Sequence, residues 1–180
     1  MKLLSPVKIY SLYLFNLGTT GMKHLNKVAH VVQLQAYARI GGFSSTQPLQ
    51  CGLLQTDGSF YHKSGFSRVA MILKSENGKR EIKDTQIIPR CVDSTETEWA
   101  SVSRGLLFAL EEGERNINVE NDNFSVVSHL ILQDSVPKQE YVKYMRYMIL
   151  TTASKYNWVG IRWVPREMNK ADELFRKQLK

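Results

Sequence analysis

The chain has 180 residues, 43% hydrophobic and 10% aromatic, which is typical of one globular domain with a buried core. No run approaches the ~18 consecutive apolar residues of a membrane-spanning helix, so we expect no membrane partner. Its two cysteines, Cys51 and Cys91, have no companion at metal-ligand spacing, which favours a reducing, intracellular compartment over a disulfide framework.

The formal net charge of +7 is unevenly distributed. Residues 1–56 contain no Asp or Glu, whereas their basic residues are Lys2, Lys8, Lys23, Lys27 and Arg39. A basic, acid-free segment before a nearly neutral remainder indicates a polyanion partner, a docking element for another protein, or a targeting sequence such as a mitochondrial presequence. Cytoplasm, nucleus and organelle all stay open. Solvated lysines on a surface helix are the alternative.

The first fifty residues differ from the rest in pattern. Apolar residues from Leu25 to Ala36 recur at helical spacing, and residues 41–50 are rich in Gly, Ser and Pro. We therefore predict a basic N-terminal extension and linker over residues 1–50 and one folded domain over residues 51–180.

Three extended segments open the folded part, at residues 51–62, 64–75 and 80–89. The Asn77-Gly78 pair between the second and third is a strong hairpin signal. The pattern predicts an antiparallel meander of three strands.

A long helix is predicted over residues 94–113, with Ser94 or Thr95 as its N-cap and Gly113 as its stop signal. The elements expected after it are a strand at 117–121, a short helix at 124–133, a long amphipathic helix at 139–156, a strand at 158–165 and a final helix at 169–179. The order βββαβααβα predicts an α/β fold, with a mixed five-stranded sheet and helices on both of its faces.

Four acidic residues stand at positions that folding alone does not favour. Asp57 lies within the first strand, where an unpaired buried carboxylate is costly. Glu98 lies in the first turn of the long helix, Asp122 ends the fourth strand, and Asp172 begins the last helix. A mixed sheet can bring these positions together, and gathered carboxylates repel one another unless a cation lies among them. Oxygen-rich clusters suit Mg²⁺ or Mn²⁺. Taken singly, each acid could be a helix cap or a surface residue.

Four stretches, in the order TDGSF, TETEWASVSRGLLFAL, INVENDNFSVVSHL and VPREMNKADEL, resemble the ribonuclease H type I family. The resemblance is to the branch with a final motif of the form VPRExNxxADxL, and it covers roughly residues 51–180. It implies an RNase H-like fold and a metal-dependent endoribonuclease. Such an enzyme hydrolyses the RNA strand of RNA–DNA hybrids and leaves 3′-hydroxyl and 5′-phosphate ends.

The resemblance also implies roles for the four acids. Asp57, Glu98, Asp122 and Asp172 would be the catalytic residues and would hold two Mg²⁺ or Mn²⁺ ions. Glu96 competes with Glu98 for the second place. We prefer Glu98 because EWASVSRGL resembles the start of the family's helix, and Glu96 is then a first-turn acid that stabilises the helix through its dipole.

Small polar residues near these acids are candidates for contacts with the 2′-hydroxyls of an RNA strand. The predicted substrate-binding residues are Gly58, Ser59, Ser94, Thr95, Asn123 and Arg166. Hydroxyl and amide residues at such places are also ordinary turn and cap residues.

Two features depart from the family pattern. The loop before Asp172 lacks the histidine that many members carry, so Arg166 or Glu167 would have to substitute for it, and we expect slower turnover. The basic insertion between two central helices is also missing.

Hybrid affinity would then come from the basic extension or from the long helix at 139–156 and its flanks, where the basic residues are Lys138, Lys143, Arg146 and Lys155. Tyr141, Tyr144 and Tyr147 on that helix could stack on nucleotides, although their helical spacing favours a core position.

Rival functions stay open. The main one is a non-catalytic RNase H fold that serves as a nucleic-acid-binding or scaffold subunit of a larger complex, since fold does not determine function. Another nuclease of the same superfamily is a second. A generic nucleotide-binding protein is a third, but the chain has no Gly-rich phosphate loop. We expect a monomer, with the extension available for docking to another protein.

Overall fold

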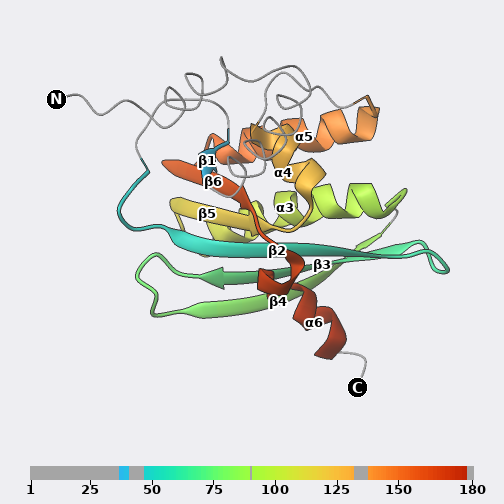
Figure 1. The fold of residues 1–180 in the computed structure, drawn as a ribbon, viewed down its shortest axis with the longest axis horizontal. Helices are drawn as coiled ribbons and strands as arrows, with labels where there is room; N and C mark the ends of the chain where they lie inside the picture. The colour runs from blue at the N-terminus through green and yellow to red at the C-terminus, as the bar shows by residue number, and fades with distance from the viewer. Residues whose placement is uncertain (1–36, 41–46, 90, 132–137, 178–180) are drawn as a thin grey trace, which may run out of the picture.

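A computed structural model describes residues 37–40, 47–89, 91–131 and 138–177 (Figure 1). The helical pattern predicted up to Ala36 lies outside the described residues. The strands are β1 (Ala38–Arg39), β2 (Gly52–Tyr61), β3 (Phe66–Lys74), β4 (Glu81–Pro89), β5 (Asn116–Asn121) and β6 (Trp158–Trp163). The helices are α3 (Ser94–Glu111), α4 (Phe124–Ile131), α5 (Glu140–Ala153) and α6 (Asp172–Lys177), with a 3₁₀ turn, η2, at Arg166–Met168. No helix among the described residues is both long and apolar enough to span a membrane.

The described strands form a single mixed sheet in the order β1-β6-β5-β2-β3-β4. β2, β3 and β4 are antiparallel, as the meander predicted, and the turn between β3 and β4 contains Gly78 at a φ of 67°. β2, β5 and β6 are parallel, with helices in their connections. The predicted α/β fold with a mixed sheet and helices on both of its faces is confirmed.

The sheet has six strands rather than the predicted five. The sixth, β1, comes from the segment predicted as extension and linker, and it pairs antiparallel with β6 through Ala38 and Arg39. A strand of two residues is too short to show the alternation of polar and apolar side chains by which strands are recognised. The prediction missed β1 for that reason.

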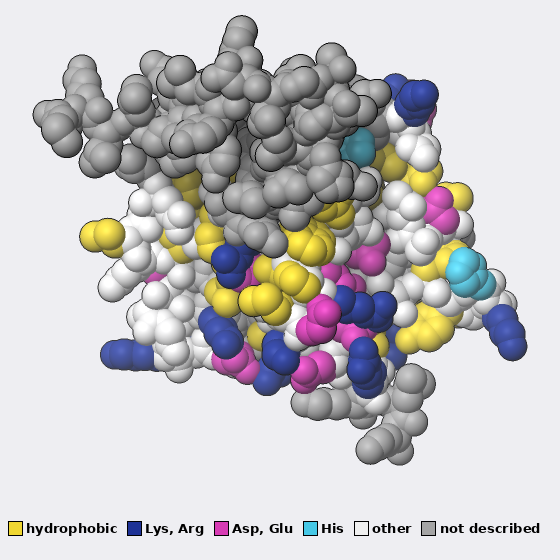
Figure 2. Space-filling view, in the orientation of Figure 1, with side chains coloured by type: hydrophobic (Ala, Val, Ile, Leu, Met, Phe, Trp, Pro, Cys, Tyr) yellow, Lys and Arg dark blue, Asp and Glu magenta, His cyan; other side chains and the backbone are white. Residues whose placement is uncertain are grey.

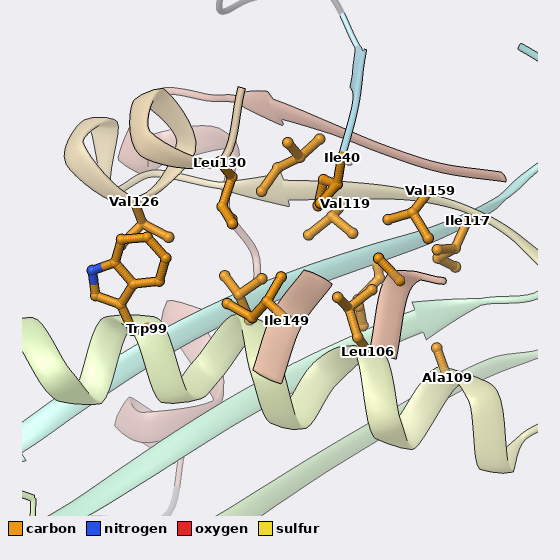
Figure 3. Close-up of a cluster of buried hydrophobic side chains, with 14 of the residues drawn as sticks. Ile40, Trp99, Leu106, Ala109, Ile117, Val119, Val126, Leu130, Ile149 and Val159 are labelled. Carbon is orange, nitrogen blue, oxygen red and sulfur yellow. The ribbon is translucent and has the colours of Figure 1, made fainter. Parts of the chain in front are cut away.

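The main core lies between one face of the sheet and helices α3, α4 and α5 (Figure 3). Trp99 and Leu106 of α3 are buried there, together with Ile149 of α5. Ile40, directly after β1, also belongs to this core. α6 lies apart from these helices in Figure 1 and packs on the opposite face, where Phe175 meets Ala70 and Ile72 of β3.

The start of α3 differs slightly from the prediction. Its N-cap is Asp93 rather than Ser94 or Thr95, because the Asp93 carboxylate accepts a hydrogen bond from the backbone N–H of Glu96. The Glu96 carboxylate in turn accepts from the backbone N–H of Val92 at 2.6 Å. These two bonds satisfy one N–H of the first turn, that of Glu96, and the N–H of Val92 just before the helix. Glu96 is thus a first-turn acid, as predicted.

Two tyrosines of α5 lie on a different face from the one predicted. Tyr144 and Tyr147 are 62% and 65% exposed. The buried face of this helix is formed instead by Val142, Ile149, Thr152 and Ala153. Tyr141 is partly buried, and its hydroxyl donates to Asp93 at 2.8 Å.

Candidate functional site

The candidate site forms where two parallel strands separate. β2 pairs with β5 from Gly52 to Gln55, and the pairing ends at the Gln55–Glu120 position. β2 continues beside β3 to Tyr61, so Asp57 lies just past the point of separation. Asp122 lies one residue beyond the end of β5. Both carboxylates therefore stand beyond the last β2–β5 pair, where open α/β sheets commonly bind ligands. We call this place, where β2 and β5 separate after Gln55 and Glu120, the crevice.

Two helices bring the other acidic residues to this crevice. Glu98 is the fifth residue of α3, a helix that packs against β2. Asp172 is the first residue of α6. Gly58 permits the close approach of α3, because a Cβ there would lie 2.7 Å from the carbonyl oxygen of Thr97. The four predicted acids thus come from β2, α3, the end of β5 and α6.

The pKa values of Asp57 and Glu98 reflect burial and the closeness of other acids. Burial, followed by the charge of Asp122, raises the pKa of Asp57 to about 7. Burial, followed by the charges of Asp57 and Asp122, raises the pKa of Glu98 to about 9. Asp57 and Glu98 therefore lack sufficient compensating positive charge among the described residues.

Glu98 also shows an unmet hydrogen-bonding demand. Its Oε2 is buried and has no hydrogen-bond partner within the described part of the chain. A buried oxygen of this kind is costly unless it finds a proton or a cation. The carboxylate donor set around it is of the type that binds hard divalent cations, so the residues present fit Mg²⁺ or Mn²⁺.

Asp172 is held differently from the other three. Arg166 donates to its Oδ1 at 2.8 Å, and Arg176 donates to its Oδ2. Although burial acts in the opposite direction, these arginines lower the pKa of Asp172. In this arrangement, no three acidic, imidazole or thiol side chains of the described residues converge as ligands on one point. A metal ion would have to compete with the arginines for Asp172.

Asn169 links the candidate acids and was not predicted from the sequence. Its side-chain N–H₂ donates to Asp122 Oδ1 and to the backbone oxygen of Thr56, both at 2.9 Å. Its Oδ1 accepts from the backbone N–H of Ala171, next to Asp172. The side chain is almost completely buried. Asn169 therefore fixes Asp122 relative to β2 and to the start of α6.

A second set of hydrogen bonds attaches the η2 loop to β2, and it was not predicted from the sequence either. Gln55 donates to the backbone oxygen of Met168 and accepts from the backbone N–H of Lys170, so it holds the loop on both sides of Asn169. Gln55 also donates to Glu120 at 2.7 Å, and Glu120 accepts from Tyr37 and Arg162. A polar residue two positions before Asp57, on the same face of β2, was the available signal.

The family of the chain follows from a sequence comparison. Residues 55–177 match the model of the reverse transcriptase-like family, a span that contains all four acids. The chain belongs to this family. Its members have an RNase H-like fold, so the predicted resemblance to the ribonuclease H type I family is confirmed. No curated protein matches the chain.

Solved structures agree on the fold. The N-terminal RNase H domain of a Mycobacterium tuberculosis protein is 20% identical, with a TM-score of 0.62, and the match covers 69% of this chain and 90% of that one. RNase H1 from the halophilic archaeon Halobacterium salinarum is 22% identical, with a TM-score of 0.62 and coverage of 68% and 92%. LC11-RNase H1, solved in complex with an RNA/DNA hybrid, is 18% identical, with a TM-score of 0.58 and coverage of 72% and 99%.

The predicted substrate-binding residues of this RNase H-like chain fall into two groups. Ser59 lies on β2 next to the crevice, Ser94 and Thr95 are exposed at the start of α3, and Arg166 is exposed beside Asp172. Asn123 instead caps α4, since its Oδ1 accepts from the backbone N–H of Val126. Gly58 is required by the packing of α3, as shown above.

The basic residues of α5 and its flanks differ in whether they are already paired within the chain. Lys143 forms an ion pair with Glu140, and Arg146 donates to the backbone oxygen of His129. Lys138 and Lys155 are exposed.

Proposed function

We propose that this chain is a ribonuclease H, a metal-dependent endonuclease that hydrolyses the RNA strand of RNA–DNA hybrids. The observation that carries the proposal is the crevice beyond the β2–β5 pair, where Asp57, Glu98, Asp122 and Asp172 approach one another. The buried Oε2 of Glu98, which has no hydrogen-bond partner among the described residues, supports the proposal that a cation completes this cluster. Figure 2 shows one face of the molecule, on which acidic and basic side chains gather near the middle.

In this proposal the four acids hold two Mg²⁺ or Mn²⁺ ions. Bound ions would supply an activated water and stabilise the attacking and leaving oxygens of the phosphodiester, giving 3′-hydroxyl and 5′-phosphate ends. The protein contributes orientation, because Asn169 holds Asp122 and Gln55 holds the loop before Asp172. Arg166, which carries a positive charge at the crevice, is suited to contact the phosphate in place of the family's loop histidine.

RNA would be distinguished from DNA by its 2′-hydroxyls. Ser59, Ser94 and Thr95 present hydroxyl groups on the two elements that carry Asp57 and Glu98. Their placement on β2 and at the exposed start of α3 suits contacts with a strand that lies across the crevice. The exposed Lys138 and Lys155 would add salt-dependent affinity.

Cleavage of a labelled RNA strand tests the proposal. The strand is presented as RNA–DNA hybrid, duplex RNA and single strand, with Mg²⁺, Mn²⁺ or a chelator. We expect cutting of the hybrid alone, dependent on metal and reduced at least about 1,000-fold in Asp57→Asn, because the isosteric amide removes the central charge. The control is Asp84→Asn, which changes a carboxylate on β4 outside the crevice. Equal cutting by Asp57→Asn and wild type would contradict the proposal.

A non-catalytic scaffold is the alternative, and one observation favours it. Both oxygens of Asp172 are engaged by arginines, as in a structural ion-pair cluster. On this alternative, hybrid binding would persist without any cleavage, whatever the metal. The same experiment, with binding measured in parallel, separates the two functions.

A further inference from the structure

The face of the sheet that carries Asp57 continues beyond the crevice. Side chains two residues apart on a strand lie on the same face, so Ser59 and Tyr61 follow Asp57 along β2. In the paired strand β3, Arg68 lies opposite Ser59, and Phe66 lies opposite Tyr61. At ~3.3 Å per residue, Tyr61 is about 13 Å from Asp57, a distance of a few nucleotides.

These residues line a shallow hollow of about 290 Å³, formed by Tyr61, Ser64, Phe66, Arg68 and Ile87. Phe66 and Ile87 are 52% and 66% exposed, although both are large and apolar. In Figure 2, hydrophobic side chains lie next to the charged cluster, toward the end of the sheet at which β2 turns into β3. An exposed apolar surface beside a candidate site is more informative than a single exposed side chain.

Arg68 gives this hollow a charge. Its Nε is buried without a hydrogen-bond partner, and none of the ion pairs among the described residues includes it. No acid of the described chain therefore neutralises its guanidinium charge. Arginine and aromatic side chains side by side are the combination with which proteins bind unpaired nucleotides, through phosphate contacts and base stacking.

We propose that this hollow binds an unpaired extension of the RNA strand, next to the hybrid held at the crevice. The bases of a duplex are stacked on one another and cannot lie flat on Phe66 or Tyr61, whereas unpaired bases can. The preferred substrate is then a hybrid with a single-stranded RNA tail rather than a blunt hybrid. This inference rests on the proposed function and makes it more specific.

The test measures binding and cleavage of matched substrates by the full chain. Binding is measured by fluorescence anisotropy in chelator, with a blunt hybrid and with hybrids that carry an unpaired RNA or DNA tail at either end. We expect an RNA tail at one end to tighten binding about 10-fold, as one or two stacked bases would. In Phe66→Ala and in Arg68→Ala the ratio of tailed to blunt affinity falls to about 1.

Lys79→Ala is the charge-matched control, since Lys79 is exposed in the turn at the opposite end of β3. It removes one positive charge, as Arg68→Ala does, but leaves the tail advantage intact. Thermal unfolding of each variant checks that the fold is retained.

The outcomes separate this inference from the proposed function. A blunt hybrid that is bound and cut, with no advantage from any tail, overturns the inference alone. An equal advantage from a DNA tail overturns the assignment to the RNA strand. If Phe66→Ala instead changes the molar mass in solution, the hollow is an interface between copies, and the inference is wrong. No binding or cutting of any hybrid would remove the proposed function as well.

Discussion

At the scale of single residues, two carboxylates of the crevice, those of Asp57 and Glu98, are held where burial disfavours their charged form. Asp57 is buried in the sheet and Glu98 has a buried oxygen without a partner. Burial and the charge of Asp122 raise the pKa of Asp57, whereas burial and the charges of Asp57 and Asp122 raise the pKa of Glu98. Such an arrangement does not stabilise the fold, because buried like charges destabilise the native state. A bound cation reverses the balance, since each carboxylate then gains an opposite charge.

This balance predicts how stability depends on pH without metal. Because the folded-state pKa values of about 7 and about 9 lie above the ordinary value of about 4, the native state binds more protons than the unfolded state between pH 4 and 9. Stability from these groups is therefore present at low pH and lost as pH rises through that window. We expect Asp57→Asn to raise the unfolding temperature at pH 8 by roughly 5 °C, or about 2 kcal/mol.

Thermal unfolding from pH 5 to pH 8.5, in chelator and in Mg²⁺, checks this expectation. Wild type should regain stability with Mg²⁺, whereas Asp57→Asn should respond much less. A wild-type unfolding temperature that rises with pH in chelator, with no gain in the variant, would show that the acids are compensated within the protein.

Arg166 gives a second prediction at this scale. It donates to Asp172 and lowers the pKa of that residue, so it occupies a carboxylate that an ion would otherwise bind. We expect Arg166→Ala to bind Mn²⁺ about 3-fold more tightly in isothermal titration, because one competitor for Asp172 is removed. The same variant should bind hybrid more weakly, since it loses a charge at the crevice. Lys170→Ala, which removes an exposed cation paired with Glu173, is the control and should do neither. Unchanged or weaker Mn²⁺ binding by Arg166→Ala would contradict the competition.

At the scale of elements, the crevice depends on how the η2 loop is attached to the sheet. Gln55 contacts backbone groups on both sides of Asn169, and Asn169 reaches Asp122 and the backbone of β2. Residues 168, 169 and 170 of the loop are thus hydrogen-bonded to β2 or to Asp122 just after β5. Groups that orient ligands in this way commonly affect activity about as strongly as some ligands do.

We expect Asn169→Ala to lower kcat about 30-fold while KM for the hybrid changes less than about 3-fold, because Asp122 loses its orientation but no substrate contact is removed. The buried carbonyl of Thr56 also loses a donor, so stability should fall by about 1–3 kcal/mol. Asn116→Ala is a matched control, since the Asn116 side chain donates to Glu76 at the start of β5, away from the crevice. A fall in kcat of the same size in both variants would mean that Asn169 acts through stability alone.

At the scale of the whole molecule, the order of elements could be predicted, but some connections between them could not. Periodicity and turn signals show β2, β3, β4 and α3 because each is a local pattern, and Asp57 stands out since it interrupts one. The bonds from Gln55 to Met168 and from Tyr37 to Glu120 join residues 113 and 83 positions apart. No local pattern reveals them. Tyr144 and Tyr147 were expected in the core because helical spacing shows a stripe but not which face is buried.

Contacts between residues far apart in the sequence matter most for the domain boundary predicted at residue 50. Ile40 is only 4% exposed and packs in the main core, and Tyr37 donates to Glu120, which holds Gln55. Residues 37–40 therefore support the same sheet that carries the crevice. We expect Ile40→Ala in the full chain to lower the free energy of unfolding by about 2–4 kcal/mol, through lost burial and a residual cavity. Leu49→Ala, at a fully exposed position in the same connecting segment, should change it by less than about 0.5 kcal/mol. Urea unfolding of both variants measures the difference. Equal, small effects would mean that the stable domain begins after this segment, whereas the expected difference moves its start to before residue 40.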